Sequence, residues 1–249
     1  MLKKRLVGVI TVKDGWAVQS FGYRRHLPLG HPEWLAENLD RWGADEILIL
    51  DINRTRNGQG PDLALLRRLG NLGLATPLVY GGGIGDAADA VAVIQAGADR
   101  VCLDALLHRD LTAVERISAA LGAQALIASL PVSVGPAAYD YQEKRHPPLS
   151  PDVLRLLEDG VVSEALLIDW QNEGGIAAFD ERLIDEFPRD GVPLIAFGGI
   201  TEPAQIARLV ASPRIIAVAV GNSLNYREHA MQSLRQALDS ATVRPAEYA

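Results

Sequence analysis

The segment Pro77-Leu-Val-Tyr-Gly-Gly-Gly-Ile84 decides the fold, because the chain contains it again as Pro193-Leu-Ile-Ala-Phe-Gly-Gly-Ile200. The two copies are offset by 116 residues (200 − 84). Each is a short apolar run, typical of a buried parallel strand, and its glycines precede a helical pattern. Such glycines leave backbone N–H groups accessible at a helix start, which suits a phosphate. A diglycine is equally typical of a tight strand–helix turn without a ligand, so the repetition carries the signal.

The repeat extends on both sides of this segment. Residues 46–51 match residues 164–169 at an offset of 118 (169 − 51), and residues 101–107 match residues 218–224 at an offset of 117 (224 − 107). Three collinear matches at nearly one offset indicate two homologous halves that each contain four strand–helix pairs. Eight such pairs in 249 residues predict an α/β protein with one domain, a (β/α)8 TIM barrel. The expected boundaries are half-barrels at 1–121 and 122–240 and a loose tail at 241–249.

Apolar runs and turn residues give the expected order of elements. Two long, basic and aromatic loops, at 13–31 and 131–149, interrupt that order. Loops of this length are lids or disordered segments, and the second could contain a small hairpin. They could cover an anionic sugar nucleotide or be surface loops without a ligand. The predicted strands are 5–10, 46–51, 77–80, 100–104, 125–130, 164–169, 193–197 and 215–220, with helices at 32–42, 61–70, 86–96, 111–121, 151–159, 180–187, 202–211 and 227–240 and a short extra helix at 222–225.

Composition excludes several classes of function. The net charge of −7 disfavours nucleic acid as a partner, although a small anionic ligand needs only local positive potential. The single cysteine, Cys102, lies in an apolar run, so no internal disulfide is possible, and neither metal-ligand spacing nor another cofactor is indicated. Because no signal peptide and no run of 18 apolar residues is present, we expect a cytoplasmic protein that does not enter a membrane.

The half-barrel repeat, the twin glycine turns and Lys13-Asp14-Gly15 together resemble the HisF/HisA family over essentially the whole chain. The start of the chain, Arg5 followed by Val12-Lys13-Asp14-Gly15, is most similar to HisF, the cyclase subunit of imidazole glycerol phosphate synthase. The resemblance implies a barrel that accepts ammonia from a glutaminase subunit docked on its N-terminal face. It also implies cyclisation of a substrate that carries two phosphates.

The acid–base residues of that family are not retained. The resemblance places its two catalytic aspartates at Thr11 and Leu130, and neither side chain can transfer protons near pH 7. The family's lysine in the first loop corresponds to Gln19. Losing each acid or base should cost about 10²–10⁴-fold in rate, so the catalytic residues are unassigned. Candidate polar residues on the functional face are Asp51, Asp104, Asp169, Tyr80 and Asn222; Asp51 and Asp169 are repeat-related and could both be ancestral scaffold.

The phosphate sites that the resemblance implies are retained in part. In the first half the glycines Gly82 and Gly83 are present, but the family's Asn-Thr pair is replaced by Asp104-Ala105. A carboxylate there repels phosphate and could accept a hydrogen bond from a hydroxyl or amine, unless Asp104 instead caps the helix that starts near Asp110. We therefore expect one altered site and one usable site. The usable second-half site comprises Gly198, Gly199, Gly221 and Asn222.

The opposite, N-terminal face keeps its charges. In the family, a ring of charged side chains surrounds the mouth of the ammonia channel, and an aspartate that matches Asp99 signals to the glutaminase. Strand starts elsewhere also carry charges that are merely solvated or paired, so this match depends on the resemblance. The four matching ring residues all keep their sign: Arg5, Glu46, Arg100 and Glu164.

Three functional hypotheses follow. The first is an ammonia-channelling barrel that forms a heterodimer with a HisH-like glutaminase and binds a small phosphorylated or sugar-nucleotide ligand; the barrel could itself be only a conduit for ammonia or an activator. It resembles the divergent HisF-like proteins of sugar amidation in bacterial surface-polysaccharide (O-antigen) pathways. The second is a true cyclase of histidine biosynthesis in which Asp51 and Asp169 have taken over proton transfer. The third is a catalytically silent scaffold barrel.

Overall fold

Eight parallel strands form a closed barrel in the computed structural model, which describes residues 3–135, 137–225, 229–238 and 242–245. Pairing of the last strand with the first, with Arg5 opposite Ala217, closes the barrel. The predicted single (β/α)8 barrel is confirmed. In spatial order the strands are β1 (Arg5–Lys13), β4 (Glu46–Asp51), β5 (Leu78–Gly81), β6 (Arg100–Leu103), β7 (Leu126–Ser133), β9 (Glu164–Asp169), β10 (Leu194–Phe197) and β11 (Ile215–Val220).

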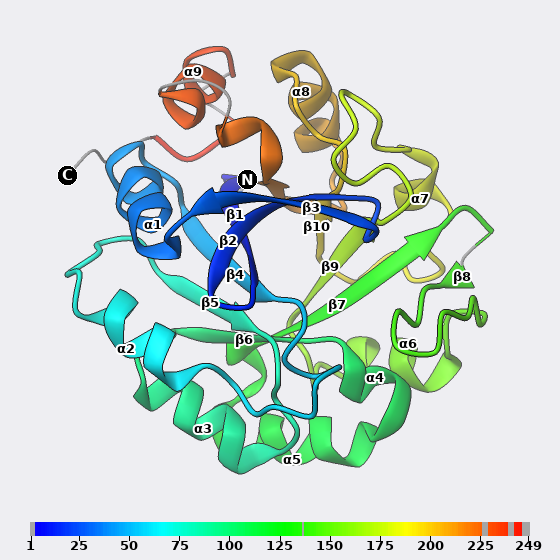
Figure 1. Ribbon diagram of the computed structural model, residues 1–249. Coiled ribbons are helices and arrows are strands. Elements are labelled where there is room, and N and C mark those ends of the chain that lie inside the picture. The colour runs from blue at the N-terminus through cyan, green and yellow to red at the C-terminus, as the bar shows by residue number, and fades with distance from the viewer. Residues whose placement is uncertain (1–2, 136, 226–228, 239–241, 246–249) are drawn as a thin grey trace.

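Helices surround the barrel on all sides (Figure 1). Several begin with a side-chain cap, since Asp62, Asp86, Asp110 and Ser150 each accept a bond from a backbone N–H in the first turn. In the described part of the chain, no helix is both long enough and apolar enough to cross a membrane. The helices are α1 (Pro32–Arg41), α2 (Leu63–Gly70), α3 (Ala87–Gln95), α4 (Ala105–Arg109), α5 (Leu111–Leu121), α6 (Pro151–Glu158), α7 (Arg182–Asp185), α8 (Pro203–Ala211) and α9 (Ala230–Gln236), with 3₁₀ turns η1 (Ala123–Ala125) and η2 (Asn222–Asn225).

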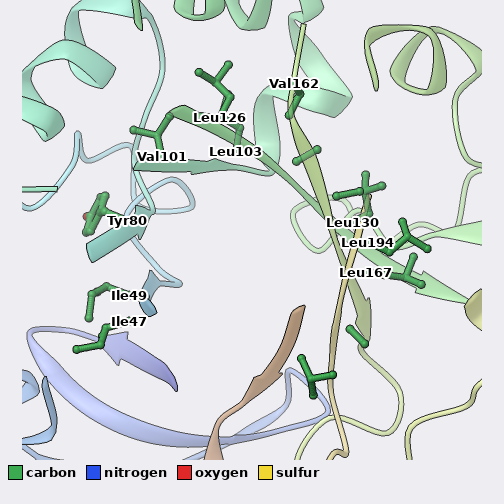
Figure 2. Packing of buried hydrophobic residues seen from close by; sticks show 14 of the residues in the cluster. Ile47, Ile49, Tyr80, Val101, Leu103, Leu126, Leu130, Val162, Leu167 and Leu194 are labelled. Atoms are coloured by element: carbon green, nitrogen blue, oxygen red, sulfur yellow. The ribbon is translucent and has the colours of Figure 1, made fainter. Parts of the chain in front are cut away.

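Alternate strand residues form two separate apolar clusters. Because successive side chains of a strand point to opposite faces, one set packs against the helices and the other fills the barrel. The outer cluster includes Ile47, Tyr80 and Leu130 together with helix residues (Figure 2). The inner cluster, which we call the lumen, contains Val7, Val9, Leu48, Val79, Cys102, Ile127, Leu166, Ile168, Trp170, Ile195, Phe197, Ala217 and Ala219.

Both long loops are structured. In the first loop, 13–31, residues 16–30 form an antiparallel ribbon of β2 (Trp16–Phe21) and β3 (Arg25–Gly30), so the expectation of disorder is wrong there. This ribbon continues β1, since Thr11 pairs with Val18. The small hairpin expected in the second loop is present, because β8 (Ala137–Ala138) pairs antiparallel with β7. Two ordered structures, the β2–β3 ribbon and the β7–β8 hairpin, therefore follow β1 and β7 at the C-terminal end of the barrel.

Several element boundaries differ from the sequence-based expectation. An unpredicted helix, α4, follows β6 directly, and the expected helix 180–187 is reduced to the four residues of α7. The last helix starts at Ala230, and residues 227–228 and 239–240 of its predicted span lie outside the described residues. The tail was predicted to be loose, yet Val243 is buried and bridges to Lys4 in parallel. That pairing anchors residues 242–245 on the start of the barrel.

Candidate functional site

Two pockets open at the C-terminal end of the barrel, one over each half. The first-half pocket, about 200 Å³, lies over the glycine turn Gly81–Gly83. The second-half pocket, about 360 Å³, lies over Gly198 and Gly199. Thr11, Glu173 and Phe197 line both pockets, so these three residues form the partition between them. This end of a TIM barrel is where catalytic and binding residues collect.

The first-half pocket is rich in polar and charged groups. Basic side chains enter it from four segments, and Tyr23, Tyr139 and Tyr141 add aromatic walls. Glu173 accepts bonds from the Ser20 hydroxyl, at 3.1 Å, and from the backbone of Gly22 and Tyr23, and burial raises its pKa. A pocket with cations on its rim suits an anionic ligand. The basic lining residues are Lys13, His26, Arg56 and Lys144.

Asp104 and Ser129 form a hydrogen-bonded pair inside the first-half pocket. The Ser129 hydroxyl donates to Asp104 Oδ2 at 3.2 Å, and the other carboxyl oxygen lies 3.9 Å from His108 Nε2. Asp104 does not cap a helix, since Asp110 caps α5 and the Asp104 side chain makes no capping bond to α4. Burial raises the pKa of Asp104 to about 7. A carboxyl group with this pKa can exchange protons at neutral pH.

The two positions assigned to the lost acids differ in orientation. Thr11 faces the pockets, whereas Leu130 packs in the outer cluster against the helices. Its neighbour Ser129 takes the inward position, because side chains alternate along β7. Leu130 therefore lines neither pocket, whereas Ser129 lines the first-half pocket. Gln19 is buried in the ribbon and lines neither pocket.

Other candidate residues serve the scaffold. Asp169 accepts bonds from the Asn172 side chain, at 2.8 Å, and from the Asp180 backbone, so it holds its own loop together. Tyr80 points into the outer cluster, where its hydroxyl accepts from the Asp62 N–H at 2.9 Å; it was expected on the functional face. Asp51 lines the first-half pocket, and burial raises its pKa to about 7. Of the two repeat-related aspartates, only Asp51 lines a pocket.

The second-half pocket has a different chemistry from the one expected. The Asn222 amide is already engaged, because it donates to the Ser20 carbonyl and accepts from the Ser20 N–H. Glu173 and Glu202 line the pocket, and no cationic side chain does so within the described residues. A phosphate there would depend on backbone N–H groups and on the buried Ser223 hydroxyl, which has no bonding partner among the described residues. Binding of phosphate at Gly198, Gly199 and Gly221 stays a prediction.

Both glycine turns are needed for backbone packing. A Cβ on Gly82 would lie 2.4 Å from the Asp51 carbonyl oxygen, and one on Gly198 would lie 2.5 Å from the Asp169 carbonyl oxygen. Gly83 has φ +71° and its N–H already donates to the Thr55 hydroxyl. The turns thus hold each strand end against the preceding strand.

An aromatic cluster covers the barrel mouth. Tyr139 stacks on Trp170 with centroids 4.0 Å apart, and His146 and Tyr23 lie at 5.1 Å and 6.0 Å from Tyr139. Trp170 is buried and belongs to the lumen cluster. Tyr23 and Tyr139, one from each long loop, thus both pack against Trp170 beside the first-half pocket.

The opposite end of the barrel carries a closed ring of four charges. Arg5 pairs with Glu46 at 2.9 Å and with Glu164 at 2.8 Å, and Arg100 pairs with the same two carboxylates at 3.2 and 3.0 Å. These residues start four different strands, so their side chains meet across the lumen entrance. Asp99 is exposed at this end and accepts from the Leu78 N–H at 2.8 Å. The predicted ring residues therefore meet in space.

Comparison with known proteins agrees with this architecture. The profile of the family described as histidine biosynthesis protein matches residues 5–230. The chain belongs to this family. Imidazole glycerol phosphate synthase subunit HisF of Bacillus cereus is 26% identical over 98% of both chains, and HisF of Lacticaseibacillus paracasei is 26% identical over 98% of this chain and 99% of its own. HisF of Exiguobacterium sibiricum is 28% identical over 80% of this chain and 82% of its own. The resemblance inferred from the repeat is confirmed.

Several residues that line the first-half pocket were not identified from the sequence. Ser129 was overlooked because its neighbour was assigned in its place, and Glu173 lies in a loop that gave no local pattern. Arg56 and Lys144 come from loops whose direction only the fold determines. The signal available beforehand was the concentration of basic residues in the loops after strands.

We expect Asp104→Asn to raise the free energy of unfolding at pH 8 by about 1–3 kcal/mol and to change it little near pH 4. Asp104 has a pKa of about 7 in the folded protein, above its ordinary value of 3.8. The folded state therefore holds the proton more tightly than the unfolded state. As a result, the free energy of unfolding of the wild type falls as pH rises from about 4 to 7. Asparagine stays neutral and keeps an oxygen for Ser129. Urea unfolding of both proteins at several pH values measures the difference; parallel pH profiles would contradict the raised pKa.

Proposed function

We propose that this HisF-family barrel accepts ammonia from a HisH-like glutaminase docked on its N-terminal face, and that its original cyclase chemistry has been replaced. The observation that carries the proposal is the closed ring of Arg5, Glu46, Arg100 and Glu164 at the lumen entrance. Holding four charges together in a mostly buried site costs desolvation energy, and stability alone is a weak reason to keep them. A role at a partner interface explains why all four are present.

The lumen behind the ring has the apolar character that passage of a neutral molecule requires. Apart from the ring, its lining is apolar, from Val7 and Ala217 near the entrance to Phe197 at the mouth. An apolar path disfavours ammonium and other ions, since an unpaired charge is costly to bury, and accepts ammonia more readily. Cys102, Ile168 and Phe197 belong to the lumen cluster and also line the first-half pocket, so the lumen reaches that pocket.

The first-half pocket supports a small anionic acceptor. Lys13, Arg56 and Lys144 provide positive charge, and Asp104 with Ser129 provides groups that bind a hydroxyl or amine. A phosphorylated sugar or a sugar nucleotide has this combination of groups. We therefore propose amidation of a surface-polysaccharide sugar as the process that this barrel serves.

A cyclase of histidine biosynthesis is the second candidate. The observation in its favour is Asp104, whose pKa of about 7 suits general acid–base catalysis. Asp51 also has a pKa of about 7, whereas Asp169 is tied into its own loop. In this alternative the acid–base pair would be Asp104 with Asp51 or Glu173.

A cyclase assay with free ammonia and the two-phosphate substrate of the histidine pathway tests both candidates. We expect the wild type to show no turnover beyond trace level. Thr11→Asp/Ser129→Asp should raise that trace by at least about tenfold, since it places two acids at positions that line the first-half pocket. Leu130→Asp should instead destabilise the fold, because it buries a charge against the helices. Wild-type turnover at the rate of an authentic HisF would establish the cyclase alternative.

A further inference from the structure

A third cavity lies outside the barrel, on the far side of the 137–149 loop. This outer cavity, about 550 Å³, is bounded by α4, β7, the loop and the start of α6. Neither the acid–base positions nor the glycine turns described above line it, apart from the outward-facing Leu130. The cavity is large enough to hold a small organic molecule with several polar groups.

The outer cavity is predominantly basic. His108, Arg109, Arg145 and His146 line it, against one carboxylate, Asp140. Asp140 is occupied within the loop, since it accepts from the backbone of residues 142 and 143 and lies 3.7 Å from Arg145. Arg109 forms no ion pair within the described residues. The cavity therefore presents more positive charge than its own carboxylate neutralises.

The rest of the lining adds a helix start and an apolar floor. Ser150 is the N-cap of α6 and Val153 lies in its first turn, and the N-terminus of this helix carries partial positive charge. Asp152 in the same turn is paired with Arg155 at 3.3 Å. Leu107, Leu130 and Leu149 form the floor. An anionic ligand with an apolar or planar part matches both features.

The 137–149 loop separates this cavity from the first-half pocket. Tyr139, Tyr141 and Lys144 face the first-half pocket, whereas Arg145 and His146 face the outer cavity. Two contacts connect residues of the outer cavity with residues of the first-half pocket. His108 Nε2 lies 3.9 Å from Asp104, and the His146 ring stacks on Tyr139 with centroids 5.1 Å apart. A ligand in the outer cavity would thus touch residues that contact the first-half pocket directly.

We infer that the outer cavity is a second ligand site, which binds a diphosphate-bearing small molecule with its phosphates on Arg109 and Arg145 and its apolar part on the leucine floor. The inference does not depend on the glutaminase partnership, since it uses only the cavity and its charges. Arginine suits this role because its guanidinium group can bind phosphate oxygens through two parallel bonds.

Calorimetric titration of the full chain with inorganic pyrophosphate and with uridine diphosphate tests the site. We expect saturable binding of both, with the nucleotide tighter because it also covers the floor. Arg109→Gln/Arg145→Gln should weaken both by at least about tenfold, the effect expected from loss of charge-assisted hydrogen bonds. Both arginines are exposed, so the variant should fold, which circular dichroism verifies.

Two charge-matched controls locate the binding. Arg41→Gln/Arg67→Gln removes two exposed arginines from α1 and α2 and should change the affinity by less than about twofold, as expected for distant surface charges. Lys13→Gln/Lys144→Gln removes two cations from the proposed acceptor site, so saturable binding that survives in this variant and is lost in Arg109→Gln/Arg145→Gln belongs to the outer cavity. A loss of affinity in the lysine variant but not in Arg109→Gln/Arg145→Gln would overturn the inference, as would the absence of saturable binding to the wild type.

Discussion

Replacing Glu46 with alanine is expected to lower the free energy of unfolding by about 3 kcal/mol and to reduce activation of a HisH-like glutaminase by at least about tenfold. Glu46 is 7% exposed and pairs with both Arg5 and Arg100. Its removal leaves two arginines with the single carboxylate of Glu164, and breaking a buried pair usually costs about 3–5 kcal/mol. Urea unfolding measures the first effect, and glutamine hydrolysis by the reconstituted pair measures the second.

The stability loss has to be separated from the loss of coupling. Glu181→Ala breaks an exposed ion pair with Arg208 far from the ring, so it should cost less than about 1 kcal/mol and leave activation unchanged. Arg100→Lys keeps the charge but loses the fixed geometry of the guanidinium group, so it should retain more stability than activation. If Glu46→Ala unfolds as easily as predicted yet activates the glutaminase normally, the ring has only a structural role.

Gly82→Ala and Gly198→Ala are each expected to lower the free energy of unfolding by about 3–5 kcal/mol. Their φ angles, +141° and +103°, are unfavourable for alanine, and the added Cβ would lie 2.4 or 2.5 Å from a backbone carbonyl oxygen. That oxygen belongs to the preceding barrel strand, so relief of the overlap requires two strand ends to separate. Chemical denaturation measures the effect.

Gly122→Ala isolates the contribution of the backbone angle. Gly122 has φ +85°, and a Cβ added to it would meet no atom within 4 Å, so its replacement should cost only about 1 kcal/mol. A loss for Gly82→Ala as small as that for Gly122→Ala would mean that the turn can move away from Asp51. The ends of β4 and β5 would then be less tightly packed than the structure indicates.

The internal repeat was sufficient to predict the barrel, because both glycine turns and the matched strands recur at one offset. The ring was predictable from the family resemblance, which matched all four residues; of these, Glu46 and Glu164 also occupy equivalent starts of repeated strands. Side-chain direction was harder to predict. An error of one residue along β7 is enough to confuse Ser129, which lines the first-half pocket, with Leu130, which packs against the helices.

The roles of repeat-related residues also could not be separated from sequence. Asp51 and Asp169 end matching strands, yet only Asp169 finds bonding partners in the loop that follows it. The structure of the 13–31 segment escaped prediction because its strands carry basic and turn-forming residues rather than an apolar alternation. Long-range pairing with β1 determines that ribbon, and such pairing leaves little local signal.

The pairing of Val243 with Lys4 brings residues near both ends of the chain to the same end of the barrel as the charged ring. Lys4 and residues 242–244 therefore lie beside the proposed docking face. A short linker to a glutaminase would raise the local concentration of that partner without any new contact. The same geometry makes this barrel suitable for a single-chain fusion of the two activities.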